Sequence, residues 1–191
     1  MAKSRRKARE AALRALYEID IASAFVEDAV EHMIEHADME QSLVDFAVGL
    51  VNGVYDKHEA IDAQLGALLH DYDYERLAAV DRNLMRLAAF ELFHEPGIPP
   101  AVTINEAVEL AKKYSTAESG KFVNGVLGKL LADSPKANWD PSMADTPADL
   151  EEVVVDDVPE IDVEQIKEDT PAAAEFAKIG KWTIRREAPD E

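Results

Sequence analysis

A cluster of basic side chains near the N-terminus is the strongest chemical feature of the sequence. Cations in the first turn of a helix repel its dipole at a cost of roughly 0.3–1 kcal/mol each. A phosphate relieves that repulsion, because guanidinium forks and the first backbone amides of the helix both bind it. The run therefore predicts an anion-binding, nucleic-acid-binding helix, and a solubilising terminus is the alternative. Residues 1–14 contain one acidic residue, Glu10, and six basic residues: Lys3, Arg5, Arg6, Lys7, Arg9 and Arg14.

A second run with possible nucleic-acid chemistry lies at residues 121–125. Lys121 stands beside Phe122, close to Gly120 and Gly125. An aromatic ring stacks on nucleic-acid bases, and a neighbouring lysine contacts a phosphate. An aromatic residue at helical spacing is equally typical of a core position, so the residue types leave both interpretations of Phe122 open.

Other motifs do not indicate an enzyme. Residues 32–36 match H-x-x-E-H, a zinc metalloprotease pattern, but the third ligand and the substrate cleft of that class are not indicated. Residues 71–75 imitate a calcium loop, and Arg76 stands where that loop requires glycine. No glycine-rich dinucleotide motif, P-loop or nucleophile elbow occurs, and the chain has no cysteine. We predict no catalytic residue, metal site or cofactor.

The charge of the chain is unevenly distributed. A net charge of −19 would argue against a nucleic-acid partner if it were spread evenly along the chain. Residues 1–132 carry 14 basic and 22 acidic side chains, net −8, whereas residues 133–191 carry 6 and 17, net −11. No apolar run is long enough for a membrane span or a secretory signal, so a cytoplasmic protein is expected.

The elements that must position these residues are helices. Apolar residues recur at helical spacing and no alternating strand pattern appears before residue 150, which predicts an all-α domain of about seven helices over residues 1–132. Ser4 is expected to cap the first helix, and Thr103 with Glu106 has the spacing of a capping box. The expected helices cover about 5–24, 26–37, 40–57, 59–69, 81–94, 103–114 and 118–131, with a short piece near 74–79.

Residues 133–191 are predicted to be an acidic, largely disordered tail. Prolines recur among Asp and Glu, and such segments bury too little apolar surface to offset chain entropy. Two apolar clusters, at residues 153–155 and 176–184, are either partner-docking segments or accidents of a long tail. The tail itself is either a solvated appendage or a phosphate mimic that competes for the basic helix.

Several motifs in order resemble the NusB family of transcription antitermination factors. They are residues 5–10 with Ala15-Leu16-Tyr17, residues 81–92, Ile98-Pro99, residues 103–112 and residues 121–127. The resemblance covers about residues 4–132. It implies two packed helical subdomains, pairing with NusE (ribosomal protein S10), and joint binding of boxA RNA from ribosomal RNA leaders. It also implies entry into RNA polymerase antitermination complexes.

The same resemblance implies which residues make contacts. The RNA-binding residues would be Arg5, Arg6, Lys7 and Arg9, with Arg86, Lys121 and Phe122 nearby. The residues facing the protein partner would be Tyr17, Glu75 and Asp81. Two other functions stay open: a purely protein–protein adaptor, and a helical accessory domain of the kind fused to RNA cytosine methyltransferases. The sequence also leaves monomer and homodimer open.

Overall fold

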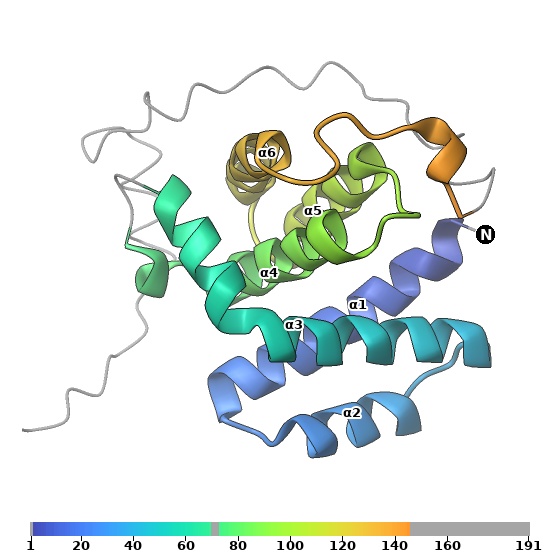
Figure 1. Ribbon diagram of the computed structural model, residues 1–191. Coiled ribbons are helices and arrows are strands. Elements are labelled where there is room, and N and C mark those ends of the chain that lie inside the picture. The colour runs from blue at the N-terminus through green and yellow to red at the C-terminus, as the bar shows by residue number, and fades with distance from the viewer. Residues whose placement is uncertain (1, 70–72, 146–191) are drawn as a thin grey trace, which may run out of the picture. The chain divides into compact units, whose positions relative to one another are not determined.

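The structure, a computed structural model, describes residues 2–69 and 73–145, and these residues form only helices and loops (Figure 1). The prediction of an all-α fold is therefore confirmed. The six α-helices are α1 (Ala2–Ala22), α2 (Val26–Glu35), α3 (Gln41–Leu68), α4 (Ala79–His94), α5 (Pro100–Tyr114) and α6 (Ala117–Ala132). Two short 3₁₀ helices, η1 (Tyr74–Arg76) and η2 (Pro141–Met143), complete the described elements.

The described helices number one fewer than the sequence suggests, because two expected helices are continuous. We expected separate helices at 40–57 and 59–69, but α3 runs unbroken through this point. Neither proline nor glycine interrupts residues 54–60, and Ile61 and Leu65 continue the buried stripe that begins at Val44. A helix without a breaker continues as long as its apolar face has a surface to bury against.

Both predicted helix caps are wrong. Helix α1 begins at Ala2, so Ser4 lies inside its first turn. Helix α5 begins at Pro100, whose fixed φ suits the first helical position. Thr103 and Glu106 therefore lie inside α5, where both are buried and use their side chains in contacts with other helices.

Helix α4 is the centre of the packing. Eleven of its sixteen residues are buried, since it packs against α1 and α3 on one side and against α5 and α6 on the other. Helices α1, α2 and α3 pack together as one group, and α4, α5 and α6 as a second (Figure 1). This arrangement agrees with the two helical subdomains that the sequence resemblance implies.

Helix direction decides which residues meet. Helix α1 runs antiparallel to α4, so Arg9 near its start meets Glu91, and Asp20 near its end meets Arg82. Helix α5 returns alongside α1 in the same direction, which places Glu106 beside Arg6. The body formed by the described helices thus has two ends. We call them the Arg9 end and the Asp20 end, and each holds its own set of charged side chains.

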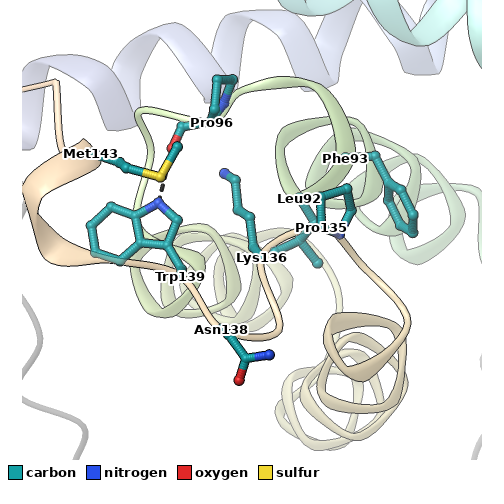
Figure 2. A pocket seen from close by; sticks show the side chains of 8 residues that line it. All are labelled: Leu92, Phe93, Pro96, Pro135, Lys136, Asn138, Trp139 and Met143. Atoms are coloured by element: carbon teal, nitrogen blue, oxygen red, sulfur yellow. Dashed lines mark hydrogen bonds between the residues drawn. The ribbon is translucent and has the colours of Figure 1, made fainter.

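Residues that follow the predicted domain boundary at residue 132 also pack against the helices. Ser134 and Lys136 are buried, and residues 133–145 run from the end of α6 to the start of α1 (orange in Figure 1). Figure 2 shows the Trp139 indole donating a hydrogen bond to the Pro96 carbonyl, at 2.9 Å. The packing of this segment was not predicted, because its high proline and acid content is typical of disordered chain. The rest of the predicted tail, residues 146–191, lies outside the described residues.

No described helix is both long and apolar enough to cross a membrane.

Two glycines of α3 give a test of this packing. A Cβ on Gly53 would lie 2.1 Å from Cζ of Phe90 on α4, whereas a Cβ on Gly49 would meet no atom within 4 Å. Gly53→Ala is expected to lower the free energy of unfolding by about 1–3 kcal/mol through overpacking. Gly49→Ala is expected to raise it by up to about 1 kcal/mol, because alanine is the better helix former. Urea denaturation measures both, and equal stability of the two variants would contradict close packing of Phe90 on α3.

Candidate nucleic-acid interface

Arg9, predicted to contact RNA, lies in the interior. Its Nε donates to Oε1 of Glu91 at 2.6 Å and its Nη2 donates to Oε2 at 3.0 Å. Thr103 on α5 donates a third hydrogen bond to the same carboxylate, at 2.8 Å. The Arg9 side chain is 3% exposed and that of Glu91 0%. In this structure Arg9 therefore holds α1 against α4 and does not reach the surface.

The other three α1 residues predicted to contact RNA remain accessible to different degrees. Arg6 forms a forked pair with Glu106 of α5, with Nε 2.9 Å from Oε2 and Nη2 2.6 Å from Oε1, and its side chain is 37% exposed. Arg5 lies over the Phe46 ring and 3.7 Å from the Asp145 carboxylate. Lys7 is exposed. These four residues thus divide into one buried anchor, two partly exposed arginines and one exposed lysine.

A basic face that the sequence resemblance did not single out lies where α1 meets α5. Lys7 and Arg14 are seven residues apart and share one face of α1, with Glu10 between them. Arg14 donates to the Tyr114 hydroxyl at 3.2 Å, and Lys113 donates to Glu10 at 2.6 Å. The Lys113 ammonium also lies 5.0 Å from the centre of the Tyr114 ring. The adjacent basic and aromatic residues at positions 112–114 were the sequence signal for this site.

Helix α6 packs against α5 and adds a further exposed lysine, Lys121. Gly120 packs under Lys112, since a Cβ on this glycine would lie 3.0 Å from Cγ of the lysine. The next residue, Lys121, is 58% exposed and 3.5 Å from Glu118. We define the basic face as Lys7 and Arg14 of α1, Lys112 and Lys113 of α5, and Lys121 of α6.

Phe122 does not belong to this surface. Its side chain is 8% exposed and packs in the hydrophobic core. The structure therefore favours the core interpretation of Phe122 over base stacking. Tyr114, partly exposed between Arg14 and Lys113, is the aromatic side chain that the basic face presents instead.

Arg86 lies at the Asp20 end, apart from the basic run. Its guanidinium donates to both oxygens of Asp62, at 2.7 and 2.6 Å, and to Asp20 at 3.1 Å. Burial opposes ionisation of Asp20, but the hydrogen bond and charge of Arg82 outweigh it and lower the pKa of this carboxyl. Burial and a hydrogen bond to Asp62 raise the pKa of Tyr74. The positive charge of Arg86 is therefore paired with Asp20 and Asp62 inside the protein.

The three residues predicted to face a protein partner come from elements that meet at this same end. Tyr17 is half-buried near the end of α1, and Glu75 is exposed in η1, where its carbonyl accepts from Arg82 at 3.2 Å. Asp81 in the first turn of α4 is 2% exposed and its buried Oδ1 has no hydrogen-bond partner among the described residues, so burial raises its pKa against the opposing effect of Ser119 and Ser115. The structure thus brings Arg86 to the predicted partner side and leaves the basic run at the opposite end.

The histidine pair of the zinc-like motif makes local contacts. His32 Nδ1 lies 3.2 Å from a Glu18 oxygen, and His36 Nδ1 lies 2.9 Å from the His32 carbonyl oxygen. Within residues 2–69 and 73–145, no group of three or more acidic or histidine side chains is placed to hold a metal.

A helical body that presents a cationic face with an aromatic side chain belongs to the class of proteins that bind polyanions through their surface. Its family follows from sequence comparison. The chain belongs to the NusB family, whose model matches residues 6–132. All five residues of the basic face lie within the matched span, and residues 133–191 lie beyond it.

Related proteins of the same family match most of their own length. The chain is 44% identical over 138 residues to the transcription antitermination protein NusB of Anaeromyxobacter dehalogenans strain 2CP-1, covering 72% of this chain and 96% of that protein. It is 41% identical over 133 residues to the protein of the same name from Desulforamulus reducens, covering 70% and 93%.

Solved structures agree with these matches. NusB of T. maritima superposes with a TM-score of 0.65 at 35% identity, covering 70% of this chain and 94% of that one. A structure of antitermination factors NusB and NusE in complex with dsRNA superposes with a TM-score of 0.64 at 28% identity. That match covers 70% of this chain and 99% of the other.

The buried pair predicts a large and asymmetric effect on stability. Arg9→Met is expected to lower the free energy of unfolding by about 3–5 kcal/mol, because it leaves the buried Glu91 carboxylate without its counter-ion. The double variant Arg9→Met with Glu91→Leu is expected to recover most of that loss, since both charges are then removed. Arg14→Met, at a side chain 72% exposed, is the control and should change stability by less than about 0.5 kcal/mol. Additive losses in the denaturant-measured cycle would contradict direct pairing.

Asp81 predicts a dependence of stability on pH. Its pKa is raised above the ordinary 3.8, so the folded state holds its proton more tightly than the unfolded state. The favourable contribution is therefore complete below pH 3.8 and is lost as the pH rises through the raised value. The stability of Asp81→Asn relative to the parent should increase from pH 4 to pH 7 in urea titrations. Asp28→Asn, an exposed first-turn residue of α2, is the control and should show no such increase.

Proposed function

We propose that this protein is an RNA-binding adaptor of transcription antitermination that acts in the cytoplasm without catalysis. It binds boxA-type RNA of ribosomal RNA leaders together with ribosomal protein S10 (NusE), and the complex joins RNA polymerase. The observation that carries the proposal is the basic face over α1, α5 and α6 in a member of the NusB family. The NusB–NusE–dsRNA structure, similar over 70% of this chain, supports both partners.

The chemistry of the basic face suits a single RNA strand. Arg14, Lys112, Lys113 and Lys121 each lie within 4 Å of a glutamate, yet all four side chains are more than half exposed, so a phosphate can replace the glutamate at each of them. Tyr114 offers a ring for stacking among these charges. Glu10 pairs with Lys113 at 2.6 Å and holds this lysine over α1. Phosphate contacts of this kind supply affinity and make it dependent on salt.

The Asp20 end suits the protein partner. Glu75 is exposed and Tyr17 half-buried there, and the last turn of α1 exposes Ile21 at 52%. An apolar side chain rimmed by acidic and aromatic groups is typical of a protein–protein contact. A composite site results, in which α1 contributes to RNA binding along its basic face and to protein binding at its C-terminal end.

Two alternatives give different observations. A purely protein–protein adaptor would bind S10 and leave RNA unprotected. A methyltransferase accessory domain would require a catalytic domain on the same chain, whereas the relative that this chain covers to 96% is named a transcription antitermination protein.

Charge removal on the basic face tests the RNA site. Lys7→Gln and Arg14→Gln should each weaken binding of a boxA oligonucleotide. Each should also reduce the slope of log affinity against log salt by about 0.7, the value for one lost single-strand phosphate contact. Lys57→Gln, at an exposed lysine of α3, is the matched control and should leave the slope unchanged. Fluorescence anisotropy with and without S10 measures this.

The outcomes separate the candidate functions. An unchanged slope in both variants would contradict RNA binding by the basic face. Tight S10 binding with no RNA affinity, alone or together, would favour the protein–protein adaptor.

A further inference from the structure

Two guanidinium groups of α1 lie over one aromatic ring of α3. Arg5 and Arg9 are one helical turn apart, and their Cζ atoms lie 5.4 and 5.6 Å from the centre of the Phe46 ring. The ring is partly buried and packs against the hydrophobic core. An arginine within about 6 Å of a ring centre is attracted by the electron-rich face of the ring. Phe46 is therefore a contact that both arginines share.

The two arginines differ in what else holds them. Arg9 is fixed by its forked pair with Glu91 and is 3% exposed, whereas the Arg5 side chain is 26% exposed. Because Arg9 is fixed, the ring that it contacts is restrained, and so is the Arg5 guanidinium on the same ring. A side chain that is already held in place loses less conformational entropy when it binds a ligand. The buried ion pair thus restrains a surface arginine through Phe46.

A carboxylate from the segment after α6 also contacts Arg5. Oδ2 of Asp145 lies 3.7 Å from Nη2 of Arg5, and the Asp145 side chain is 49% exposed. The Asp145 amide donates to the Gly97 carbonyl at 2.9 Å, which fixes the backbone beside α1. A Cβ on Gly97 would lie 1.7 Å from Oδ1 of Asp145, so glycine leaves room for this carboxylate. The carboxylate is an anionic acceptor at an arginine, as an RNA phosphate would be.

Nearby negative charge weakens the hold of Asp145 on Arg5. Burial and the charges of Glu91 and Asp145 raise the pKa of Glu95, whereas Lys136 and Arg5 oppose this shift. Asp145 and Glu95 therefore repel each other, and this repulsion offsets part of the attraction to Arg5. A partly exposed ion pair also gains little in water. An anion that arrives from the solvent can replace the Asp145 carboxylate.

We propose that Phe46 is a positioning residue for RNA binding, which holds Arg5 in place for a backbone phosphate, and that this phosphate replaces the Asp145 carboxylate. The inference rests on the proposed function and adds a phosphate subsite at the Arg9 end. Arg5 contacts the phosphate, and the other two residues act through Arg5. Loss of the ring therefore lowers RNA affinity, loss of the carboxylate raises it, and both changes require Arg5.

The first measurement removes the ring. Phe46→Leu should weaken binding of a boxA oligonucleotide about two- to fivefold at low salt, the size expected for one partly exposed cation–π contact. Phe46→Tyr keeps an aromatic ring and should restore the affinity of the parent. Fluorescence anisotropy measures both. Equal affinity of the leucine and tyrosine variants would overturn the positioning role.

The second measurement removes the carboxylate. Asp145→Asn should tighten binding of the same oligonucleotide about two- to fivefold at low salt, because one weak ion pair no longer competes. The gain should decrease toward high salt, where exposed charges are screened. Asp133→Asn, at an exposed residue of the same segment, makes the same change in net charge and should gain clearly less. Equal gains in the two variants would show an effect of net charge alone and would overturn the replacement.

The third measurement separates positioning from a general disturbance of packing. Phe46→Leu and Asp145→Asn are each combined with Arg5→Gln in a double-mutant cycle on RNA affinity. Neither should change affinity further once Arg5 is absent, because residues that act through one side chain are not additive. A loss from Phe46→Leu that persists without Arg5 would contradict positioning. A gain from Asp145→Asn that persists there would contradict replacement at Arg5.

Heparin, a polyanion without bases, distinguishes failure of this inference from failure of the proposed function. A parent protein that binds boxA RNA, with no coupling of Phe46 or Asp145 to Arg5, would overturn the subsite and leave RNA binding intact. A parent protein that binds neither boxA RNA nor heparin would overturn the proposed function and the subsite together.

Discussion

The buried ion pair between Arg9 and Glu91 is the contact on which the rest of the arrangement depends. Neither side chain reaches water, and each charge would be strongly destabilising without the other. Since Thr103 also donates to Glu91, this one carboxylate joins α1, α4 and α5. A helix held at such a point has little freedom to rotate or slide. The pair therefore fixes which face of α1 turns inward and which faces the solvent.

Helix α1 serves the core and the surface at the same time because of its periodicity. Ala8, Ala12 and Leu16 pack inward with Arg9, while Lys7 and Arg14 face outward. Acidic partners inside the protein neutralise Arg9 and Arg6, whereas Arg14, Lys112, Lys113 and Lys121 pair with neighbouring glutamates and keep side chains that are more than half exposed. An acidic protein thereby keeps a basic surface on one side. The charges around Asp20 and Arg86 form a separate network at the other end of the same helix.

The path of residues 133–145 shows where part of the negative charge of the chain lies in space. More than half of the net charge of −19 belongs to residues 133–191, which lie beyond the span shared with the family. Lys136 and Trp139 bond to backbone carbonyls of the α4–α5 turn, so these anchors depend on the path of the turn. The chain leaves the described body next to Arg5. A linear count of charges contains no information about this proximity.

The sequence by itself determined the all-helical class, most helix positions, the basic run and the family, because these depend on local periodicity, composition and ordered motifs. Only the tertiary structure decided that Arg9 is a buried anchor, that Phe122 is core, and that Thr103 and Glu106 bind other helices. It also decided that Lys112 and Lys113 join Lys7 and Arg14 in one face. The physical reason is sequence separation: the partners of Arg9 and Arg6 are 82 and 100 residues away. No pattern within one helix specifies which distant carboxylate it will meet.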